Sequence, residues 1–300
     1  MRNPLLALLE IWLRRYWQAD TAALSRLGGG RPAVVITGAS EGIGLAIAER
    51  FAGTGSALVL IARGEAALTA AADGLALRHR ALTVPLVLDI TAPDAGERIA
   101  AALASHGLYA DVLVNNAGIG LSGPFTEHDP TAIAALIDTN MRALTLLMRR
   151  FLPDMCVRGR GGVLNVASLG GYAPGPNQAA YYASKSYVIS LTRAVGYEVR
   201  GLGVRISVVS PGPVDTRFHA KMGTDAALYR YLVRGISAEQ VARTACFRWR
   251  WGLRIIFPGL FTPLLALVME LTPGIISIPI IGVLLRRPRP PVAGKDARRS

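Results

Sequence analysis

Ala33-Val-Val-Ile-Thr-Gly-Ala-Ser-Glu-Gly-Ile-Gly44 is the stretch that decides the fold class of this chain. Its first part, Ala33–Thr37, is a short apolar run rich in Val and Ile, which predicts a buried strand. A helical pattern over Ile43–Ala52 follows directly after the glycines. A strand, a glycine-rich turn and a helix in this order are typical of the first unit of a parallel α/β sheet.

The same alternation of apolar strands and helices continues along the chain. It predicts further strands at Ala57–Ala62, Val84–Leu88, Val112–Asn115, Gly162–Ala167, Arg205–Ser210 and Arg254–Phe257. It predicts further helices at Glu65–Arg78, Ala95–Ser105, Thr131–Met155, Tyr181–Arg200 and Ser237–Arg250. Apolar strands separated by helices pack as a parallel sheet with right-handed crossovers. We therefore expect a Rossmann-type, doubly wound α/β fold of about seven strands, with helices on both faces.

The composition excludes several other classes of protein. Of the 300 residues, 51% are hydrophobic, so the chain can bury a full core and is not disordered as a whole. The two cysteines and four histidines show no spacing typical of a metal site, and no metal is predicted. The formal net charge is +13, but no basic motif with interleaved aromatic residues is present, so we expect no nucleic-acid partner.

The glycine-rich turn is a candidate site for the pyrophosphate of a dinucleotide. It follows a strand and opens a helix, where free N–H groups and the helix dipole favour an anion. Its GxxxGxG spacing allows a tight turn and close approach of the backbone to a ligand. A purely structural turn is the alternative. The candidate cofactor contacts are Gly38, Ser40, Glu41, Gly42, Ile43 and Gly44.

The end of the second strand distinguishes between the two nicotinamide dinucleotides. An NAD site needs a carboxylate there for the ribose 2′-hydroxyl. This strand ends at Leu60-Ile-Ala-Arg63 instead, and a guanidinium can pair with a 2′-phosphate through two hydrogen bonds. The sequence therefore favours NADP(H) over NAD(H), unless Arg63 is only a solvated surface charge.

Tyr181 and Lys185 lie four residues apart within the predicted helix Tyr181–Arg200. Residues at this spacing share one helix face, so the two side chains are expected to be neighbours. An ammonium group beside a phenol lowers the pKa of the phenol toward the range that is useful for proton transfer. Such a pair is also common on protein surfaces, so its meaning depends on the other motifs.

Six motifs follow one another along about Ala33 to Phe257. They are Thr37–Gly44, Asn115-Asn-Ala-Gly118, Asn140, Ser168, Tyr181-x-x-x-Lys185 and Pro211-Gly-Pro-Val-Asp-Thr216. In this order, and with Ser168 placed 13 residues before Tyr181, the chain resembles the short-chain dehydrogenase/reductase family. The resemblance is specific for the family and the fold, and much less so for the substrate.

The resemblance implies a role for each matched residue. Tyr181 would be the general acid that protonates a substrate carbonyl oxygen, and Ser168 would polarise that oxygen. Lys185 would assist Tyr181 and hold the nicotinamide ribose, and Asn140 would anchor a proton relay through its main chain and a water. The other matched positions would contact the cofactor: Asp89 and Ile90 at the adenine, Asn115 and Ala117 along the adenosine ribose, and Pro211, Gly212, Val214 and Thr216 at the nicotinamide amide.

Both ends of the chain differ from the predicted catalytic domain, residues 31–257. Residues 1–30 contain Trp12, Tyr16 and Trp17 near two arginines, which predicts an amphipathic helix before a glycine hinge at residues 28–30. That helix would lie on a membrane surface, or pack on the domain or on a second subunit.

The other end, residues 258–300, is predicted as an apolar extension with a disordered basic tail. Ile255–Met269 and Leu271–Leu285 carry no charge, and prolines interrupt both. Each is too short to span a bilayer, but together they would form a hairpin at an anionic membrane surface, because arginines flank them. The alternative is a lid on the substrate pocket and a dimer surface.

The apolar ending also bears on the substrate. It resembles the family branch that holds long-chain 3-oxoacyl reductases, 3-ketosphinganine reductases and hydroxysteroid dehydrogenases, and the segment His219–Arg234 is apolar enough to close over an acyl chain or ring system. We therefore expect an NADPH-dependent reductase of a hydrophobic, lipid-like ketone, in the cytoplasm at a membrane surface, and compatible with a homodimer. The alternatives are NAD(P)+-dependent oxidation of a hydrophobic alcohol, and a non-catalytic dinucleotide-binding membrane scaffold.

Overall fold

Strand β1 (Arg31–Thr37) stands inside a seven-stranded parallel sheet in the computed structural model of this chain. The structure describes residues 22, 27, 29–223 and 235–286. The strand order is β3-β2-β1-β4-β5-β6-β9. Strands β2 and β3 are added on one side of β1, and β4, β5, β6 and β9 are added on its other side. The order of strands therefore reverses between β1 and β4, where open α/β sheets bind their ligands. The predicted Rossmann-type fold is confirmed.

The strands of this sheet are short, and most are buried on both faces, whereas the edge strand β3 is partly exposed. Besides β1 they are β2 (Ala57–Ala62), β3 (Thr83–Val87), β4 (Leu108–Asn115), β5 (Gly162–Val166), β6 (Arg205–Val209) and β9 (Ile255–Ile256). Val35 and Ile36 in β1 are fully buried although they point to opposite faces. The predicted seventh strand, Arg254–Phe257, exists but pairs through Ile255 and Ile256 only.

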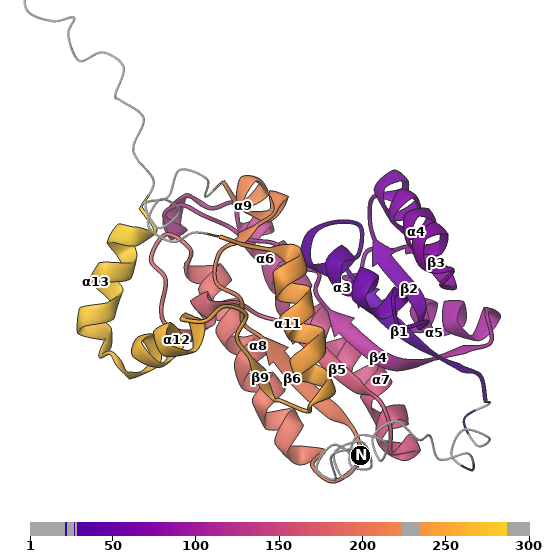
Figure 1. The fold of residues 1–300 in the computed structure, drawn as a ribbon. Coiled ribbons are helices and arrows are strands. Elements are labelled where there is room, and N and C mark those ends of the chain that lie inside the picture. Colours follow the sequence, from indigo (N-terminus) through magenta and orange to yellow (C-terminus); the bar gives the residue numbers. More distant parts are fainter. Residues whose placement is uncertain (1–21, 23–26, 28, 224–234, 287–300) are drawn as a thin grey trace, which may run out of the picture.

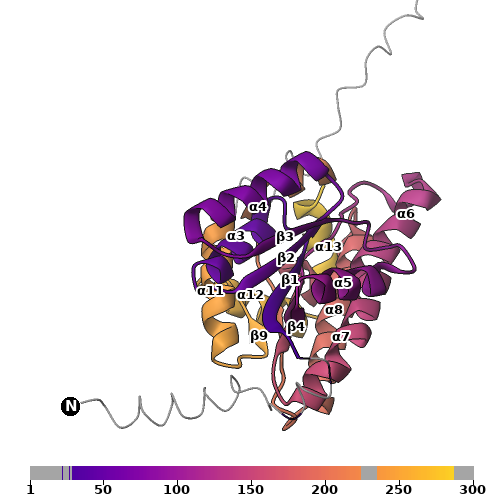
Figure 2. The same cartoon turned by 90° about the vertical axis from the view of Figure 1, so that its right-hand side faces the viewer.

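Helices cover both faces of the sheet (Figures 1 and 2). On one face, α3 (Gly42–Ala52), α4 (Glu65–His79) and α11 (Ala238–Arg250) share a core with the strands. On the other face, the core contains side chains of α5 (Ala95–Ser105), α7 (Leu144–Arg158) and α8 (Ala179–Glu198). The two layers leave the carboxyl ends of the strands open.

The helix predicted at Thr131–Met155 is not regular. It consists of α6 (Pro130–Ile137), a π-helical segment η2 (Asp138–Ala143), and α7. Such wider turns occur mostly as short insertions in α-helices, often at functional sites. By length and hydropathy the stretch Pro130–Arg158 would suffice to cross a membrane. Its side chains Leu147 and Phe151 lie in the core beneath the sheet, however, so we interpret it as a core helix.

The apolar C-terminal region forms a helical hairpin at the side of the two layers (Figure 1). Its helices are α12 (Thr262–Leu271) and α13 (Gly274–Leu284), and α12 packs against the 3₁₀ helix η3 (Leu169–Tyr172). Pro273 separates the two helices, as a residue that cannot continue α12. The uncharged half Ile255–Met269 begins in the sheet, because Ile255 and Ile256 belong to the predicted strand Arg254–Phe257. The predicted N-terminal helix and residues 287–300 of the tail lie outside the described residues, and the division into three domains stays a prediction.

Candidate active site

A cavity of about 1700 Å³ lies at the carboxyl ends of the strands. It begins at the glycine-rich turn after β1, passes the ends of β2, β4 and β5, and reaches α12 and α13. Pockets for a single small ligand usually measure about 300–1,000 Å³. This cavity is therefore large enough for a cofactor and a substrate side by side.

The glycine-rich turn adopts the backbone geometry that its glycines permit. Gly38 and Gly42 have φ of 65° and 59°, a region that other residues rarely occupy. Gly44 faces the turn rather than the cavity, since a Cβ built there would lie 2.2 Å from the Gly38 carbonyl oxygen. The other predicted residues of the turn line the cavity: Gly38, Ser40, Glu41, Gly42 and Ile43.

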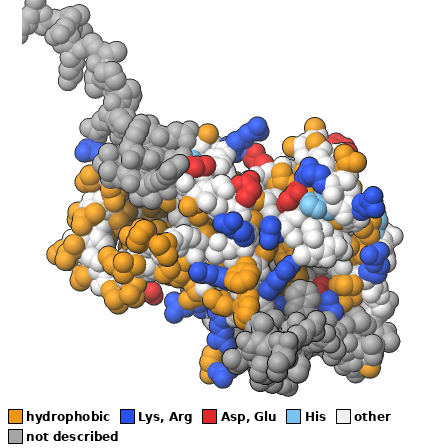
Figure 3. Space-filling view, viewed as in Figure 1, with side chains coloured by type: hydrophobic (Ala, Val, Ile, Leu, Met, Phe, Trp, Pro, Cys, Tyr) orange, Lys and Arg blue, Asp and Glu red, His pale blue; other side chains and the backbone are white. Residues whose placement is uncertain are grey.

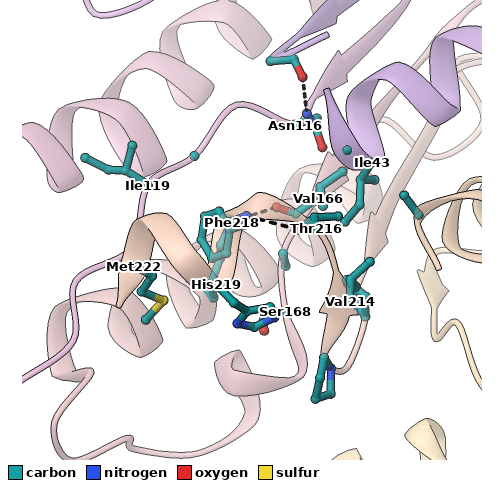
Figure 4. A pocket seen from close by; sticks show the side chains of 18 of the residues that line it. Ile43, Asn116, Ile119, Val166, Ser168, Val214, Thr216, Phe218, His219 and Met222 are labelled. Atoms are coloured by element: carbon teal, nitrogen blue, oxygen red, sulfur yellow. Dashed lines mark hydrogen bonds between the residues drawn. The ribbon is translucent and has the colours of Figure 1, made fainter. Parts of the chain in front are cut away.

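Asn116 fastens this turn to the loop after β4. Its Nδ2 donates to the carbonyl oxygens of Thr37 and Gly38, each at 3.0 Å, and one of these contacts is drawn in Figure 4. Thr37 Oγ1 in turn accepts from the N–H groups of Asn116 and Ala117, at 3.0 and 3.1 Å. Asn116 belongs to the motif Asn115-Asn-Ala-Gly118, but the sequence predicted no role for it.

Asn115, its neighbour, is turned the other way. Its Nδ2 donates to Asn165 Oδ1 at 2.9 Å inside the sheet, and the residue is 3% exposed. Ala117 lines the cavity and Asn115 does not. The Asn115 side chain therefore faces the interior of the sheet, because alternate residues of a strand and its extension face opposite sides, and its predicted place along the adenosine ribose stays a prediction.

Tyr181 and Lys185 lie together on α8, as their spacing predicted. The Lys185 Nζ lies 5.7 Å from the centre of the Tyr181 ring and donates to the Val166 carbonyl oxygen at 3.0 Å. Both side chains line the cavity, and both residues are less than a tenth exposed. Burial lowers the pKa of Lys185 to about 8, because an ammonium group loses its hydration in the interior. The group still carries its positive charge at neutral pH.

Asn140 lies behind this pair, in the π-helical segment. Its Oδ1 accepts from Ile119 N at 2.9 Å, and its Nδ2 donates to Ile119 O at 2.8 Å and to Ser184 Oγ at 3.0 Å. Ser184 Oγ donates to the Tyr181 carbonyl oxygen at 2.7 Å. Asn140 is 1% exposed and does not line the cavity. Its side chain connects α8 to the loop after β4, so it holds the wall of the site in place.

Gly118, in that loop, leaves room for this arrangement. A Cβ built on it would lie 3.2 Å from Asn140 Oδ1 and 3.5 Å from Lys185 Nζ. A side chain at this position would therefore crowd two of the predicted catalytic residues. Sequence reasoning gave this glycine no separate role.

Ser168 follows β5 and faces the same cavity. Its Oγ accepts from Gly170 N at 3.1 Å, so the residue caps η3. Leu169 N donates to the Pro211 carbonyl oxygen at 2.8 Å, which connects this end of β5 to the loop after β6. In that loop the predicted nicotinamide contacts all line the cavity: Pro211, Gly212, Val214 and Thr216.

Residues 32–227 of this chain match the model of a protein family that is described as "short chain dehydrogenase". That range contains the glycine-rich turn, Ser168, Tyr181 and Lys185, which together form the cavity just described. The chain belongs to the short-chain dehydrogenase family. It is an NAD(P)-dependent oxidoreductase.

Individual members of the family show how far the likeness extends. Sulfoacetaldehyde reductase 2 of Chromohalobacter salexigens is 35% identical over 215 residues, which are 70% of this chain and 84% of the relative. A short-chain dehydrogenase from Sphingobium yanoikuyae, solved in complex with NADPH, superposes with a TM-score of 0.70 and 30% identity over 76% of this chain and 88% of its own. The bulky-bulky ketone specific alcohol dehydrogenase from Comamonas testosteroni gives a TM-score of 0.67 and 25% identity over 77% and 87%.

The residues of this short-chain dehydrogenase fit a nicotinamide dinucleotide. A Cβ built on Gly42 would lie 3.4 Å from Thr216 Cγ2, so a side chain there would fill the crevice between the glycine-rich turn and the loop after β6. Farther along the cavity lie Arg63, Asp89 and Ile90, at the positions predicted for the adenosine half. Hydrogen bonds from Thr91 hold the pKa of Asp89 below its ordinary value, and the charge of Arg63 acts in the same direction.

Helix α9 (Arg217–Met222) covers the middle of the cavity. Figure 4 shows Phe218, His219 and Met222 projecting from it, with Ile119 on one side and Ile43 and Val214 on the other. The Phe218 ring lies 5.7 Å from that of Tyr181. Of the predicted cover His219–Arg234 the structure describes residues 219–223, of which His219, Lys221 and Met222 line the cavity, whereas residues 224–234 lie outside the described residues.

The hairpin α12–α13 forms the far wall of the cavity. The sequence left two roles open for this region, a hairpin at a membrane surface or a lid on the substrate pocket. Its inward-facing side chains are apolar with few exceptions and include Leu265, Val268, Met269, Ile281 and Leu285. Their place in the same cavity as Ser168, Tyr181 and Lys185 could not be deduced from the sequence, because no pattern fixes how a C-terminal hairpin packs. The cavity therefore has polar groups near β5 and α8, and an apolar wall opposite them.

Proposed function

We propose that this chain is an NADPH-dependent reductase that converts the ketone of a hydrophobic, lipid-like substrate to a secondary alcohol. A 3-oxoacyl chain, a ketosphinganine or a steroid has the required chemistry. The observation that carries the proposal is the placement of Tyr181, Lys185 and Ser168 in one cavity whose opposite wall is the apolar hairpin α12–α13. A carbonyl group would meet the polar residues while the rest of the substrate lies against the hairpin.

The preference for NADPH rests on Arg63. Its guanidinium lines the cavity beside Asp89, and no acidic residue stands at the end of β2 to accept from a ribose 2′-hydroxyl. A planar guanidinium binds phosphate through paired, charge-assisted hydrogen bonds. The NADPH complex of the Sphingobium relative supports the same choice.

The chain's own residues would supply the proton and position the carbonyl oxygen. The bound dinucleotide supplies the hydride for the carbonyl carbon. Tyr181 Oη donates its proton to the carbonyl oxygen as negative charge develops there, and Ser168 Oγ donates a hydrogen bond to the same oxygen. The Lys185 ammonium favours the phenolate that remains and binds the nicotinamide ribose hydroxyls. Asn140 keeps α8 against the loop after β4, which maintains these distances.

The apolar wall favours a hydrophobic ketone over a small charged one. A sulfonate would have no described basic partner on α12 or α13 within the cavity, since their lining side chains carry no charge. For this reason we do not extend to this chain the substrate named for the Chromohalobacter relative. The bulky ketones named for the Comamonas structure are nearer in chemistry to what this cavity would hold.

A comparison of two adjacent tyrosines tests the proposed reaction. Purified protein is mixed with NADPH and a long-chain 3-oxoacyl thioester, a steroid ketone or a small polar aldehyde, and the nicotinamide absorbance is followed. Tyr181→Phe should lower kcat by about 10²–10⁴-fold, the usual contribution of a general acid. Tyr182→Phe is the matched control, because its ring packs over Gly170 and Gly175 instead of beside Lys185.

The outcomes separate the candidate functions. Turnover of the hydrophobic ketones with retained NADPH binding in Tyr181→Phe supports the proposal. Rapid reduction of the polar aldehyde alone would contradict the substrate class. Turnover only with NADP+ and a hydrophobic alcohol would support the reverse reaction, and no turnover with any compound would favour a non-catalytic scaffold.

A further inference from the structure

The outer side of the hairpin α12–α13 is an exposed apolar surface. Figure 3 shows hydrophobic side chains gathered over these two helices. Ile275 is 86% exposed and Leu260 is 85% exposed. We call this the hairpin surface and define it by the exposed residues that do not line the cavity: Leu260, Phe261, Leu264, Leu267, Leu271, Ile275, Ile276, Ile278 and Val283. Continuous apolar patches on a protein surface mark contacts with a membrane or with another protein.

Helix α13 is apolar on every side. Ser277 is its only residue with a polar side chain, and it is buried. A helix that is hydrophobic all round is normally enclosed by a protein core or by lipid. In α13 only Ser277 and Ile281 are buried by the chain, so most of its surface lacks a cover among the described residues.

The dimensions of the hairpin fit one leaflet of a bilayer. Helices α12 and α13 have 10 and 11 residues, so at about 1.5 Å per residue each is roughly 15 Å long. The hydrocarbon core of a bilayer is about 30 Å thick. The hairpin is thus too short to span it, and Pro273 turns the chain back at the tip.

The charges around the hairpin suit an anionic surface. Glu270 is the only acidic residue between Phe257 and Arg286, and its carboxylate lies 3.6 Å from Arg193 Nη1. Exposed arginines stand at both ends of the segment, Arg254 before it and Arg286 after it. Basic residues beside an inserted apolar segment are attracted to the acidic lipids of the cytoplasmic leaflet.

The hairpin connects its outer surface to the cavity. Leu265, Val268 and Ile280 line the cavity and are also 42%, 51% and 55% exposed. Through these three side chains the inward faces of α12 and α13 continue into their outward faces. A lipid-like molecule could pass along this apolar path without entering bulk water.

We propose that the hairpin surface inserts into the cytoplasmic leaflet of an anionic membrane, and that the substrate enters the cavity from that leaflet. A bilayer explains the all-round apolar character of α13 and the flanking arginines together. A second copy of this chain would cover the apolar residues but would not by itself account for the flanking arginines. The entry route rests on the proposed function, whereas membrane insertion does not.

Vesicle flotation with the full chain tests the insertion. Wild-type protein should float with phosphatidylcholine vesicles that contain phosphatidylglycerol, and less with phosphatidylcholine alone. A double variant, Leu267→Glu with Ile275→Glu, should reduce the bound fraction at least about tenfold, since a charge near the bilayer interior costs more than 1.4 kcal/mol. The matched control is Leu77→Glu, because Leu77 is 85% exposed on α4, away from the hairpin. Equal flotation of the double variant and the wild type would overturn the proposal.

The oligomeric state tests whether a second copy of this chain, rather than a membrane, covers the hairpin surface. Sedimentation velocity is measured on the same proteins without vesicles, and circular dichroism checks that they are folded. If the double variant turns a wild-type dimer into a monomer while flotation is unchanged, the hairpin surface is a subunit interface and the proposal is wrong. If flotation is lost and the oligomeric state is unchanged, the membrane proposal is supported.

A kinetic split tests the entry route separately. For a long-chain ketone dissolved in vesicles, the double variant should raise KM about tenfold or more, while kcat and KM for a water-soluble ketone stay at wild-type values. Equal losses with both ketones would contradict entry from the leaflet. If no ketone is reduced at all, the proposed function fails, but the flotation result still decides the insertion.

Discussion

Arg63 and Asp89 lie at the end of the cavity that we propose for the adenosine half of the cofactor. Both lie at carboxyl ends of neighbouring strands, β2 and β3, and both line the cavity. Asp89 Oδ1 accepts from Thr91 N at 2.9 Å and from Thr91 Oγ1 at 2.8 Å, which fixes the carboxylate. Arg63 has no such attachment among the interactions described, so its guanidinium is available to a phosphate.

Replacing Arg63 should change the preference between the two cofactors. In Arg63→Asp the charge-assisted hydrogen bonds to a 2′-phosphate are lost, and these are worth about 1.5–3 kcal/mol. We therefore expect KM for NADPH to rise about 10- to 100-fold. The new carboxylate can accept from a ribose 2′-hydroxyl, so KM for NADH should fall. Steady-state kinetics with both cofactors measure the change.

The control for this substitution is Arg98→Asp, which makes the same charge change on the exposed side of α5. It should leave both KM values unchanged. If Arg63→Asp also leaves the ratio of the two KM values unchanged, Arg63 does not bind the 2′-phosphate and is a solvated surface charge.

At the scale of elements, the turn between β1 and α3 depends on the absence of a side chain at Gly44. A Cβ there would lie 2.2 Å from the Gly38 carbonyl oxygen and 2.4 Å from Asn116 Nδ2. Gly44→Ala should therefore displace the turn, lower the free energy of unfolding by about 1–3 kcal/mol, as overpacking does, and abolish nucleotide binding. Urea unfolding and NADPH fluorescence titration measure both effects.

Gly64 provides the matched control. Its φ is −88°, and no heavy atom lies within 4 Å of a Cβ built on it. Because Gly64 itself lines the cavity, the two variants are compared in stability: Gly64→Ala should stabilise the chain slightly, by about 0.4–1 kcal/mol, because it restricts the unfolded chain. If both alanine variants behave alike, the close packing of Gly44 against the turn is not what the site requires.

Helix α9 is held over the cavity by ion pairs with the glycine-rich turn. The Glu41 carboxylate pairs with Lys221 Nζ and lies 3.8 Å from Arg217 Nη1. These side chains are largely exposed, so each pair stabilises this position of α9 by at most about 1 kcal/mol. Lys221→Met should therefore raise the dissociation rate of NADPH about two- to fivefold, as measured by stopped-flow fluorescence. Arg149→Met, an exposed residue of α7, is the control and should leave that rate unchanged.

The elements differ in how far the sequence predicts them. The strand Ala57–Ala62 and the helix Ala95–Ser105 have the predicted bounds, because apolar runs and helical periodicity are local properties. The π-helical segment at Asp138–Ala143 was missed. It depends on Asn140 bonding to the backbone of Ile119, a contact between residues that only the fold brings together.

For the whole molecule, the sheet was predictable and the far wall of the cavity was not. A parallel order of strands follows from their alternation with helices, and it brings Ser168 and Tyr181 to one edge. Asn115 and Asn116 are the same residue type in sequence, and only the strand geometry decides which faces the turn. The position of Leu265 against the cavity depends on how the hairpin packs on η3, which no local pattern specifies.

Two buried groups give the folded molecule opposite responses to alkaline pH. Burial lowers the pKa of Lys185 from 10.5 to about 8, and burial raises the pKa of Cys246 from 9.0 to about 12. Between about pH 8 and 10.5 the unfolded chain binds more protons at Lys185 than the folded chain does, so this residue makes stability rise with pH. Between about pH 9 and 12 the folded chain retains the Cys246 proton that the unfolded chain loses, so this residue makes stability fall.

Two variants separate these contributions in the protein without cofactor. Relative to Lys185→Met, the wild type should gain stability as the pH rises from about 8 to about 10.5, by up to a few kcal/mol, since one pKa unit corresponds to about 1.4 kcal/mol. Relative to Cys246→Val, the wild type should lose stability above about pH 9. Comparing each variant with the wild type cancels the titration of all other groups. Urea unfolding across this pH range measures the differences, and wild-type and variant curves that stay parallel would show that burial does not shift these two groups.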